Sequence, residues 1–313
     1  MAGTYSGAAA IITGANPTQD LSRDIYVETL EAFNRRNVFL ALVTKQTIEH
    51  GKAGQFIIGG KTDGSDVATH DRGKQIAVSD TEFNERTIVI DRPVYVAKRI
   101  DQFEERVAHY DVRGPITNMM GETLAYKVDI AVADQMWLTS QGATPNEPRA
   151  SNPGPNANIV VAAGATATLK GDALAESIFA AVAILEGNDD YSEKVCILSP
   201  QDYGYIVQSG HAVNEDFTNG NGGFDTGVVH MVAGVRIVSS NNVKGSTGGT
   251  GGLTAKLHGY VFSQGAVGVL ELIGLRTNQE KQIDFLDDTL MTAYYAMGVG
   301  TLRPECAVAL VGA

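Results

Sequence analysis

The sequence contains few cysteines, and both stand in apolar surroundings. Only Cys196 and Cys306 occur among the 313 residues, and each lies within a short apolar run. Thiols in such surroundings are typical of core residues in a reducing compartment. We therefore expect neither a disulfide nor a reactive cysteine nucleophile.

An excess of basic residues and long hydrophobic runs are also absent. Lys and Arg total 24 against 36 Asp and Glu, which gives a formal net charge of −12. This balance argues against a protein whose main task is to grip nucleic-acid phosphates, but not against a container wall that faces DNA. No apolar stretch approaches the ~20 residues needed to span a bilayer, and the start of the chain lacks the regions of a signal peptide. We expect a soluble protein that is made in a cytoplasm and has no membrane partner.

Motifs for catalysis, metal binding and nucleotide binding are missing or incomplete. Residues 54–62 carry one glycine too many for a phosphate-binding loop, and no helix is expected after them. The segment 214–225 lacks the central glycine and the closing glutamate of a calcium loop. Of the six histidines only His109 has an organised polar context, and we interpret this context as a fastening between two helical pieces. The sequence predicts a protein that is not an enzyme and holds no metal or cofactor.

A polar β-ribbon is the most informative local feature. Gln55–Ile58 is a short β-type run and Thr87–Val96 a longer one, with a polar, turn-rich stretch between them. This pattern predicts a long two-stranded hairpin whose outer half has few apolar residues. Because an isolated hairpin is marginal in water, we expect a neighbouring molecule to hold it, as an arm laid on that neighbour.

Helices and strands are predicted on both sides of this ribbon, in an α+β order. Before it we expect a mobile arm over 1–19 and a helix over 21–43 that breaks near 34–37. After it we expect helices over 101–107 and from Pro115 to about Leu138. The remaining predictions are a helix over 172–185, a strand over 193–198, a capped helix from Ser199, paired strands around Ala233-Gly234, and strands at 258–262, 267–273 and in 281–311.

Three stretches of the sequence resemble one protein family. They are Gly51–Phe56, then His109–Arg113 with Gly121–Ala125, and finally Tyr295–Gly298 with Gly300 and Leu302–Glu305. These stretches are similar to the major capsid proteins of T-seven-type podoviruses, short-tailed double-stranded DNA phages that include cyanophages. They also occur here in the order and at the approximate separations that this family shows.

The resemblance implies the coat fold named after phage Hong Kong 97, an HK97-like α+β fold. In the family its axial domain gathers around hexamer and pentamer axes, and its extended loop overlies the adjacent subunit. The expected segments are an N-terminal arm (1–49), the extended β-hairpin loop (50–98), the spine helix with part of the peripheral domain (99–160), the axial domain (161–275) and the C-terminal strands of the peripheral domain (276–313).

The function implied by the resemblance is that of a major capsid protein, assembling as hexamers and pentamers into an icosahedral shell. The expected partners are other copies of the chain, a scaffolding protein, a portal protein and packaged double-stranded DNA, contacted non-specifically on the inner face. The expected location is the virion, after assembly in the cytoplasm of a host bacterium. Alternatives are an encapsulin-like bacterial nanocompartment shell, an α/β enzyme built on residues 160–275, and a fibre or adhesin, which the absence of repeats disfavours.

Charged residues supply the candidate contacts between copies. Six of them, of mixed sign, lie near the expected ribbon tip: Lys61, Asp63, Asp66, Asp71, Arg72 and Lys74. These side chains either form a solvated turn or contact a neighbouring copy, where many weak charge interactions add. Elsewhere we expect pairing between subunits or domains at Arg99, Arg113, Arg303 and Glu305.

Overall fold

The chain forms two compact units in the part that the structure describes. The structure is a computed structural model, and it describes residues 17–59, 67, 69–70, 72–73, 75–76, 83–108, 113–141, 158–164, 166–209, 231–245, 257–282 and 288–312. Unit 1 comprises the described residues within 1–38, 91–129 and 271–297. Unit 2 comprises those within 39–90, 130–270 and 298–313.

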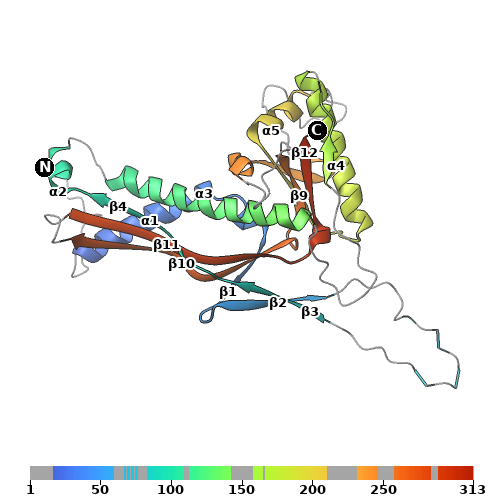
Figure 1. The fold of residues 1–313 in the computed structure, drawn as a ribbon, viewed down its shortest axis with the longest axis horizontal. Coiled ribbons are helices and arrows are strands. Elements are labelled where there is room, and N and C mark those ends of the chain that lie inside the picture. Colours follow the sequence, from blue (N-terminus) through green and yellow to red (C-terminus); the bar gives the residue numbers. More distant parts are fainter. Residues whose placement is uncertain are drawn as a thin grey trace, which may run out of the picture. The chain divides into compact units, whose positions relative to one another are not determined.

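Figure 1 shows the helices and strands of the chain. In chain order they are α1 (Pro17–Arg36), η1 (Leu40–Leu42), β1 (Thr44–Thr47), β2 (Ala53–Gly59), β3 (Phe83–Val89), β4 (Val94–Ile100), α2 (Gln102–Val107), α3 (Arg113–Ser140), β5 (Ile159–Val161), α4 (Ala167–Gly187), β6 (Lys194–Leu198), α5 (Pro200–Val207), β7 (Met231–Val232), β8 (Val235–Ser239), η2 (Asn241–Gly245), β9 (Leu257–Ser263), β10 (Val267–Gln282), β11 (Asp288–Thr301), η5 (Pro304–Cys306) and β12 (Ala307–Gly312). The described strands form a four-stranded sheet (β1-β10-β11-β4), a six-stranded sheet (β5-β12-β9-β6-β8-β7) and the β2-β3 ribbon. None of the described helices is both long and apolar enough to cross a membrane.

In unit 1, α1 packs closely against α3. A Cβ atom added at Gly121 would lie 2.5 Å from the carbonyl oxygen of Thr29 and 2.9 Å from the Cβ of Ala32, so only glycine fits without displacing α1. The ring of Phe33, on the same helix, meets that of Tyr295 on β11 at a centroid distance of 5.7 Å. α1 begins at Pro17, within the arm expected over 1–19, and ends at Arg36, where the predicted break lies.

The long helix α3 confirms the predicted spine helix and extends it at both ends. Its buried stripe runs through Met120, Leu124, Val128, Val132 and Met136, whereas Leu138 is 43% exposed. Steps of four residues rotate the stripe by about 40° each around the helix axis, and the buried side chains follow this drift to the end of the helix.

The longer β-type run, Thr87–Val96, is not one strand. β3 ends at Val89 and β4 begins at Val94, with Pro93 between them. Proline has no backbone N–H for a sheet ladder, which favours a break there. β4 pairs antiparallel with β11, from Val94↔Tyr295 to Ile100↔Thr289. Residues 94–98, which the prediction includes in the extended loop, therefore lie in the four-stranded sheet.

The ribbon itself pairs as predicted, β2 antiparallel to β3 from Ala53↔Val89 to Gly59↔Phe83. The expectation that only another molecule holds it is wrong for these two strands. Their inner face is buried within unit 2 at Phe56, Ile58 and Ile88, which are at most 9% exposed. A Cβ at Gly298 would lie 2.6 Å from the carbonyl oxygen of Val89, and one at Gly300 would lie 2.8 Å from Cγ1 of Ile88. Unit 2 therefore supports the base of the ribbon.

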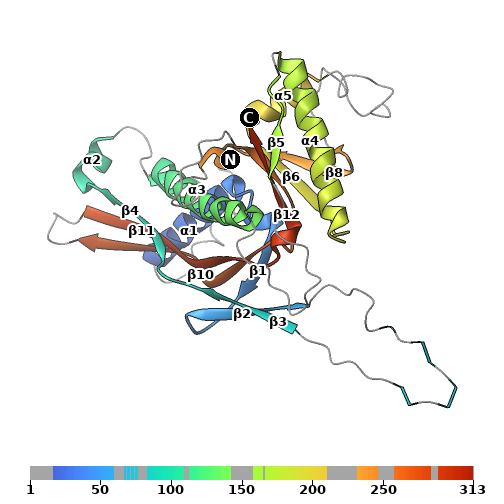
Figure 2. The same ribbon diagram turned by 45° about the vertical axis from the view of Figure 1, so that its right-hand side comes forward.

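The six-stranded sheet of unit 2 carries α4 on one face (Figure 2). Apolar residues of α4, including Leu174, Ile178 and Leu185, pack with residues of β6, β8, β9 and β12. The second strand of this sheet is β12, paired with the edge strand β5 on one side and with β9 on the other. The strand 307–312, expected in the peripheral domain, thus completes the sheet of the segment 161–275.

Several local predictions in unit 2 are confirmed. Ser199 caps α5, with its Oγ accepting a hydrogen bond from the backbone N–H of Asp202 at 3.3 Å. Ala233 and Gly234 join β7 to β8 with φ values of 52° and 75°, as a two-residue hairpin turn requires. α4 begins five residues before the expected Asp172, because Thr166 caps it. The two cysteines are buried and unpaired, as predicted.

The tight α1–α3 contact predicts opposite effects for two helical glycines. We expect Gly121→Ala to lower the free energy of unfolding by about 1–3 kcal/mol, because its Cβ overpacks α1. Gly204→Ala in α5 has open space around the added Cβ, so we expect a gain of about 0.5–1 kcal/mol from the lower entropy of the unfolded chain. Urea unfolding of both unassembled variants measures the difference. Equal effects would contradict this account of the contact.

Candidate assembly surfaces

Arg113 joins two helices of unit 1. Its guanidinium binds the carboxylate of Glu105 through two contacts, Nη2 to Oε2 at 2.9 Å and Nε to Oε1. The two side chains are 25% and 28% exposed, so water screens this pair only in part. The pair connects α2 to the first residue of α3. His109, whose polar context predicts a fastening between the two helical pieces, lies outside the described residues.

Arg99 also has a partner within its own unit. Its Nε lies 3.4 Å from Oδ2 of Asp288, between the neighbouring strands β4 and β11. Half of the Arg99 side chain is exposed, whereas Asp288 is almost buried. Exposed pairs at such distances contribute little to stability, and Arg99 keeps exposed surface that a second copy can contact.

Of the other predicted contact residues, three lie in the part of the chain that the structure describes and five lie outside it. Arg303 stands at the start of η5, and Glu305 within η5 is only 6% exposed, with its carbonyl oxygen accepting a hydrogen bond from Nδ2 of Asn188 at 3.2 Å. Glu305 is thus part of the interior of unit 2 rather than a surface charge. Arg72 is exposed. Outside the described residues lie Lys61, Asp63, Asp66, Asp71 and Lys74.

An exposed face of the ribbon is the surface that sequence analysis missed. The register places Ala53, Gln55 and Ile57 of β2 on one face with Glu85, Thr87 and Val89 of β3, and all six residues are exposed. We call these six residues the outer face of the ribbon. Ile57 is 71% and Val89 49% exposed, although the inner face is buried. The period-2 alternation of Gln55–Ile58 contains this signal, because it separates Ile57 from Phe56 and Ile58.

Burial raises the pKa of two thiols in unit 2 and of one phenol in unit 1. Burial raises the pKa of Cys196, and burial with the nearby charge of Asp190 raises the pKa of Cys306 to about 12. Both thiols therefore stay protonated at neutral pH. Only the deprotonated thiolate is a strong nucleophile, so neither cysteine is reactive. Burial also raises the pKa of Tyr295, whose hydroxyl donates to Glu271 at 2.5 Å.

Asp190 in unit 2 is an acid whose charge is stabilised by hydrogen bonds. Burial alone would raise its pKa, but hydrogen bonds from the side chain of Ser263 and from Ser192 outweigh burial and lower it. One of these donors is the backbone N–H of Ser192, 3.1 Å from Oδ1. Among the described residues, no three His, Cys, Asp or Glu side chains gather as metal ligands would.

Comparison of sequences connects the chain to phage coat proteins. A family model described as "Gp10A-like: Major capsid protein" matches residues 55–311. The major capsid protein of Escherichia phage T7 is 27% identical over 317 residues, covering 91% of this chain and 89% of that protein. The major capsid protein of Enterobacteria phage T3 is 27% identical over 323 residues, with the same two shares.

Comparison of structures gives the same result for the fold. The capsid structure of the cyanophage P-SCSP1u matches with a TM-score of 0.72 and 30% identity, over 88% of each chain. The mature capsid of bacteriophage PhiM1 matches with a TM-score of 0.71 and 17% identity, over 88% of this chain and 87% of that one. A virus-like particle from Pyrococcus furiosus matches with a TM-score of 0.58 at 14% identity, over 93% and 99%, a likeness of fold alone. These neighbours confirm the predicted HK97-like α+β fold.

The geometry of the two arginine pairs predicts unequal coupling energies. A double-mutant cycle of Arg113→Met with Glu105→Gln should give about 1 kcal/mol of coupling, because the contact is bidentate and partly buried. The same cycle for Arg99→Met with Asp288→Asn should give at most about 0.5 kcal/mol, because Arg99 is half exposed. Urea unfolding of the unassembled chain measures both cycles. A larger coupling energy for Arg99–Asp288 than for Arg113–Glu105 would contradict this prediction.

Proposed function

The chain belongs to the Gp10A-like family of phage major capsid proteins, and from this premise we propose that its copies join as hexamers and pentamers into an icosahedral shell around double-stranded DNA. That it is a phage coat protein that forms a shell with copies of itself follows from the family match and from the 30% identical cyanophage capsid. The capsid of the virion is its place of action.

The outer face of the ribbon is the observation that carries our proposal for assembly. Unit 2 buries the inner face, so the strand pair is held in place before any second copy arrives. The outer face then presents two large apolar side chains, Ile57 and Val89, beside Ala53 and three polar residues. Such a mixed surface suits a contact between copies in which apolar burial is supplemented by hydrogen bonds. We assign this face, with Arg72 and the charged residues expected at the tip, to the adjacent subunit.

Other partners belong to the same proposal. A scaffolding protein during assembly in the bacterial cytoplasm, a portal protein at one vertex, and packaged DNA on the inner face are the partners that a coat protein of this kind would meet. The net charge of −12 supports a wall that encloses DNA without gripping it, since tight phosphate binding needs basic clusters. The suppressed reactivity of both thiols supports a mechanical role without catalysis.

None of the three alternatives from the sequence is favoured. The likeness to the Pyrococcus furiosus particle, at 14% identity, is one of fold, whereas the phage matches reach 30%. An enzyme built on residues 160–275 would need that segment to complete its own sheet. Because β12 lies between β5 and β9, the segment depends on residues 307–312.

Two substitutions on neighbouring positions of β2 test the assembly surface. We expect Ile57→Glu to leave the subunit folded but to block shell closure, because it places a charge in the contact with the next copy. Phe56→Glu should unfold the ribbon in the subunit itself, because Phe56 is buried in the inner face. Electron microscopy after co-expression with the scaffolding partner measures assembly, and circular dichroism measures folding.

The control for this experiment is Val160→Glu, which changes another exposed apolar residue of unit 2 away from the ribbon. Normal closed shells from Ile57→Glu would overturn the role of the outer face. Loss of shells from Ile57→Glu together with an unfolded subunit would also overturn it, since the face would then be needed for folding rather than for assembly.

A further inference from the structure

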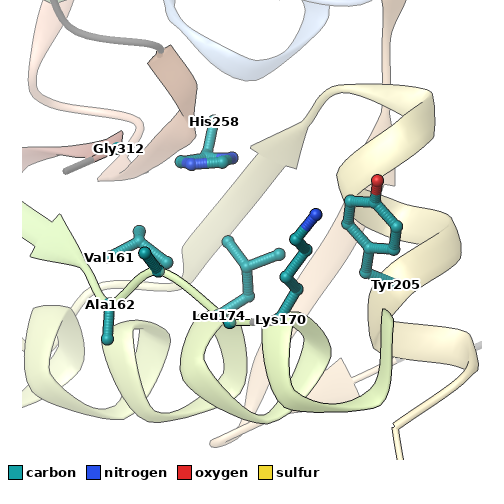
Figure 3. Close-up of a pocket in the computed structure, with 9 residues that line it drawn as sticks. Val161, Ala162, Lys170, Leu174, Tyr205, His258 and Gly312 are labelled. Carbon is teal, nitrogen blue, oxygen red and sulfur yellow. The ribbon is translucent and has the colours of Figure 1, made fainter. Parts of the chain in front are cut away.

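A pocket with a volume of about 150 Å³ lies in unit 2, beside the N-terminal half of α4. Its walls come from β5 and the residues after it, from α4, α5 and β9, and from the end of β12. Figure 3 shows the side chains that face it. Cavities of about this size hold a ligand such as benzene, so there is room for a molecule of about six non-hydrogen atoms.

One side of the pocket is lined by Lys170 of α4, Tyr205 of α5 and His258 of β9. In Figure 3 the ammonium group of Lys170 is directed toward the ring of Tyr205. The ammonium group of Lys170 lies 5.2 Å from the ring centroid of Tyr205, within the range of a cation–π contact. That contact limits the motion of a side chain that otherwise rotates freely, so the charge is placed before a ligand arrives.

A buried acid lies beside the imidazole of His258. Nδ1 of His258 lies 2.9 Å from Oδ1 of Asp202, whose side chain is only 1% exposed. The other carboxylate oxygen of Asp202 accepts a hydrogen bond from Oγ of Ser199 at 2.5 Å. The same Oγ caps α5, so this acid belongs to the start of that helix.

The other side of the pocket is apolar. Val161 and Leu174, which are 4% and 1% exposed, lie on this side together with the small side chains of Ala162 and Ala163. A ligand that fits both sides needs a negative group at one end and a short hydrocarbon at the other. A phosphate ion carries oxygens on every side, and the apolar wall would leave some of them without hydrogen bonds, at a large desolvation cost.

We propose that this pocket binds a short aliphatic carboxylate. A carboxylate oxygen accepts a hydrogen bond from Lys170 Nζ, and the hydrocarbon lies against Val161 and Leu174. This charge-assisted hydrogen bond orients the ligand, and the apolar contact adds affinity in proportion to the area buried.

Saturation-transfer NMR on the full-length chain, with butyrate as the probe, tests this site. Butyrate has six non-hydrogen atoms, and its methyl group would receive magnetisation from Leu174 and Val161. We expect a saturable signal that Lys170→Met weakens about tenfold, the loss of one charge-assisted hydrogen bond.

Controls separate this site from simpler explanations. Lys127→Met removes an exposed lysine of α3 and should leave butyrate binding unchanged. Butyramide, which has the same shape without the charge, should bind at least about tenfold more weakly. Equal binding of butyramide would reduce the site to an apolar cavity, and displacement of butyrate by an equal concentration of inorganic phosphate would make it a general anion site. Either result, or the absence of a saturable signal from the folded chain, would overturn the proposal.

Discussion

The β2–β3 ribbon lies against unit 2 because two glycines of β11 leave room for β3. A side chain at Gly298 or Gly300 would collide with Val89 or Ile88, so the ribbon would have to move away and expose its inner face. An unsupported two-stranded ribbon is marginal in water. The contact of backbone with backbone at β11 therefore decides whether the ribbon exists in the free subunit. The outer face becomes a defined surface only because the inner face is fixed in this way.

The stretches of sequence that resemble podovirus capsid proteins contribute to close packing inside one subunit. In the second stretch, Gly121 lies where α3 packs against α1, and Leu124 is buried. Gly298 and Gly300 of the third lie under the ribbon, and Glu305 lies buried in η5. Close packing tolerates little change in side-chain volume. These motifs thus identify the fold through contacts inside one subunit, and they say less about contacts between subunits.

Much of the fold could be predicted from local patterns. The cap at Ser199, the turn at Ala233-Gly234 and the long helix after Pro115 each have a short-range cause that the sequence displays. What could not be predicted depends on pairing between distant segments. The pairing of β12 with β5, and the burial of the ribbon's inner face, arise from residues more than 100 positions apart. Pro93 indicates a break between two strands, but the apolar residues on both sides of it favour one continuous strand when only the sequence is considered.

The candidate contact residues show the same limit. Charge alone placed Arg99, Arg113 and Glu305 in one class, but the structure separates them into a half-exposed pair, a helix fastening and a buried acid. A charged residue in a sequence does not reveal whether its partner lies in the same chain. The outer face of the ribbon, by contrast, follows from strand alternation once the register is known.

Hydrogen–deuterium exchange of the unassembled chain tests the central claim most directly. If unit 2 holds the ribbon, the backbone amides of 53–59 and 83–89 that bond across the two strands exchange slowly before any shell forms, at rates close to those of β9 in the same unit. Exchange of these amides as fast as in an unfolded peptide, with protection gained only in assembled shells, would contradict the claim. It would mean that a neighbouring copy, rather than unit 2, holds the ribbon.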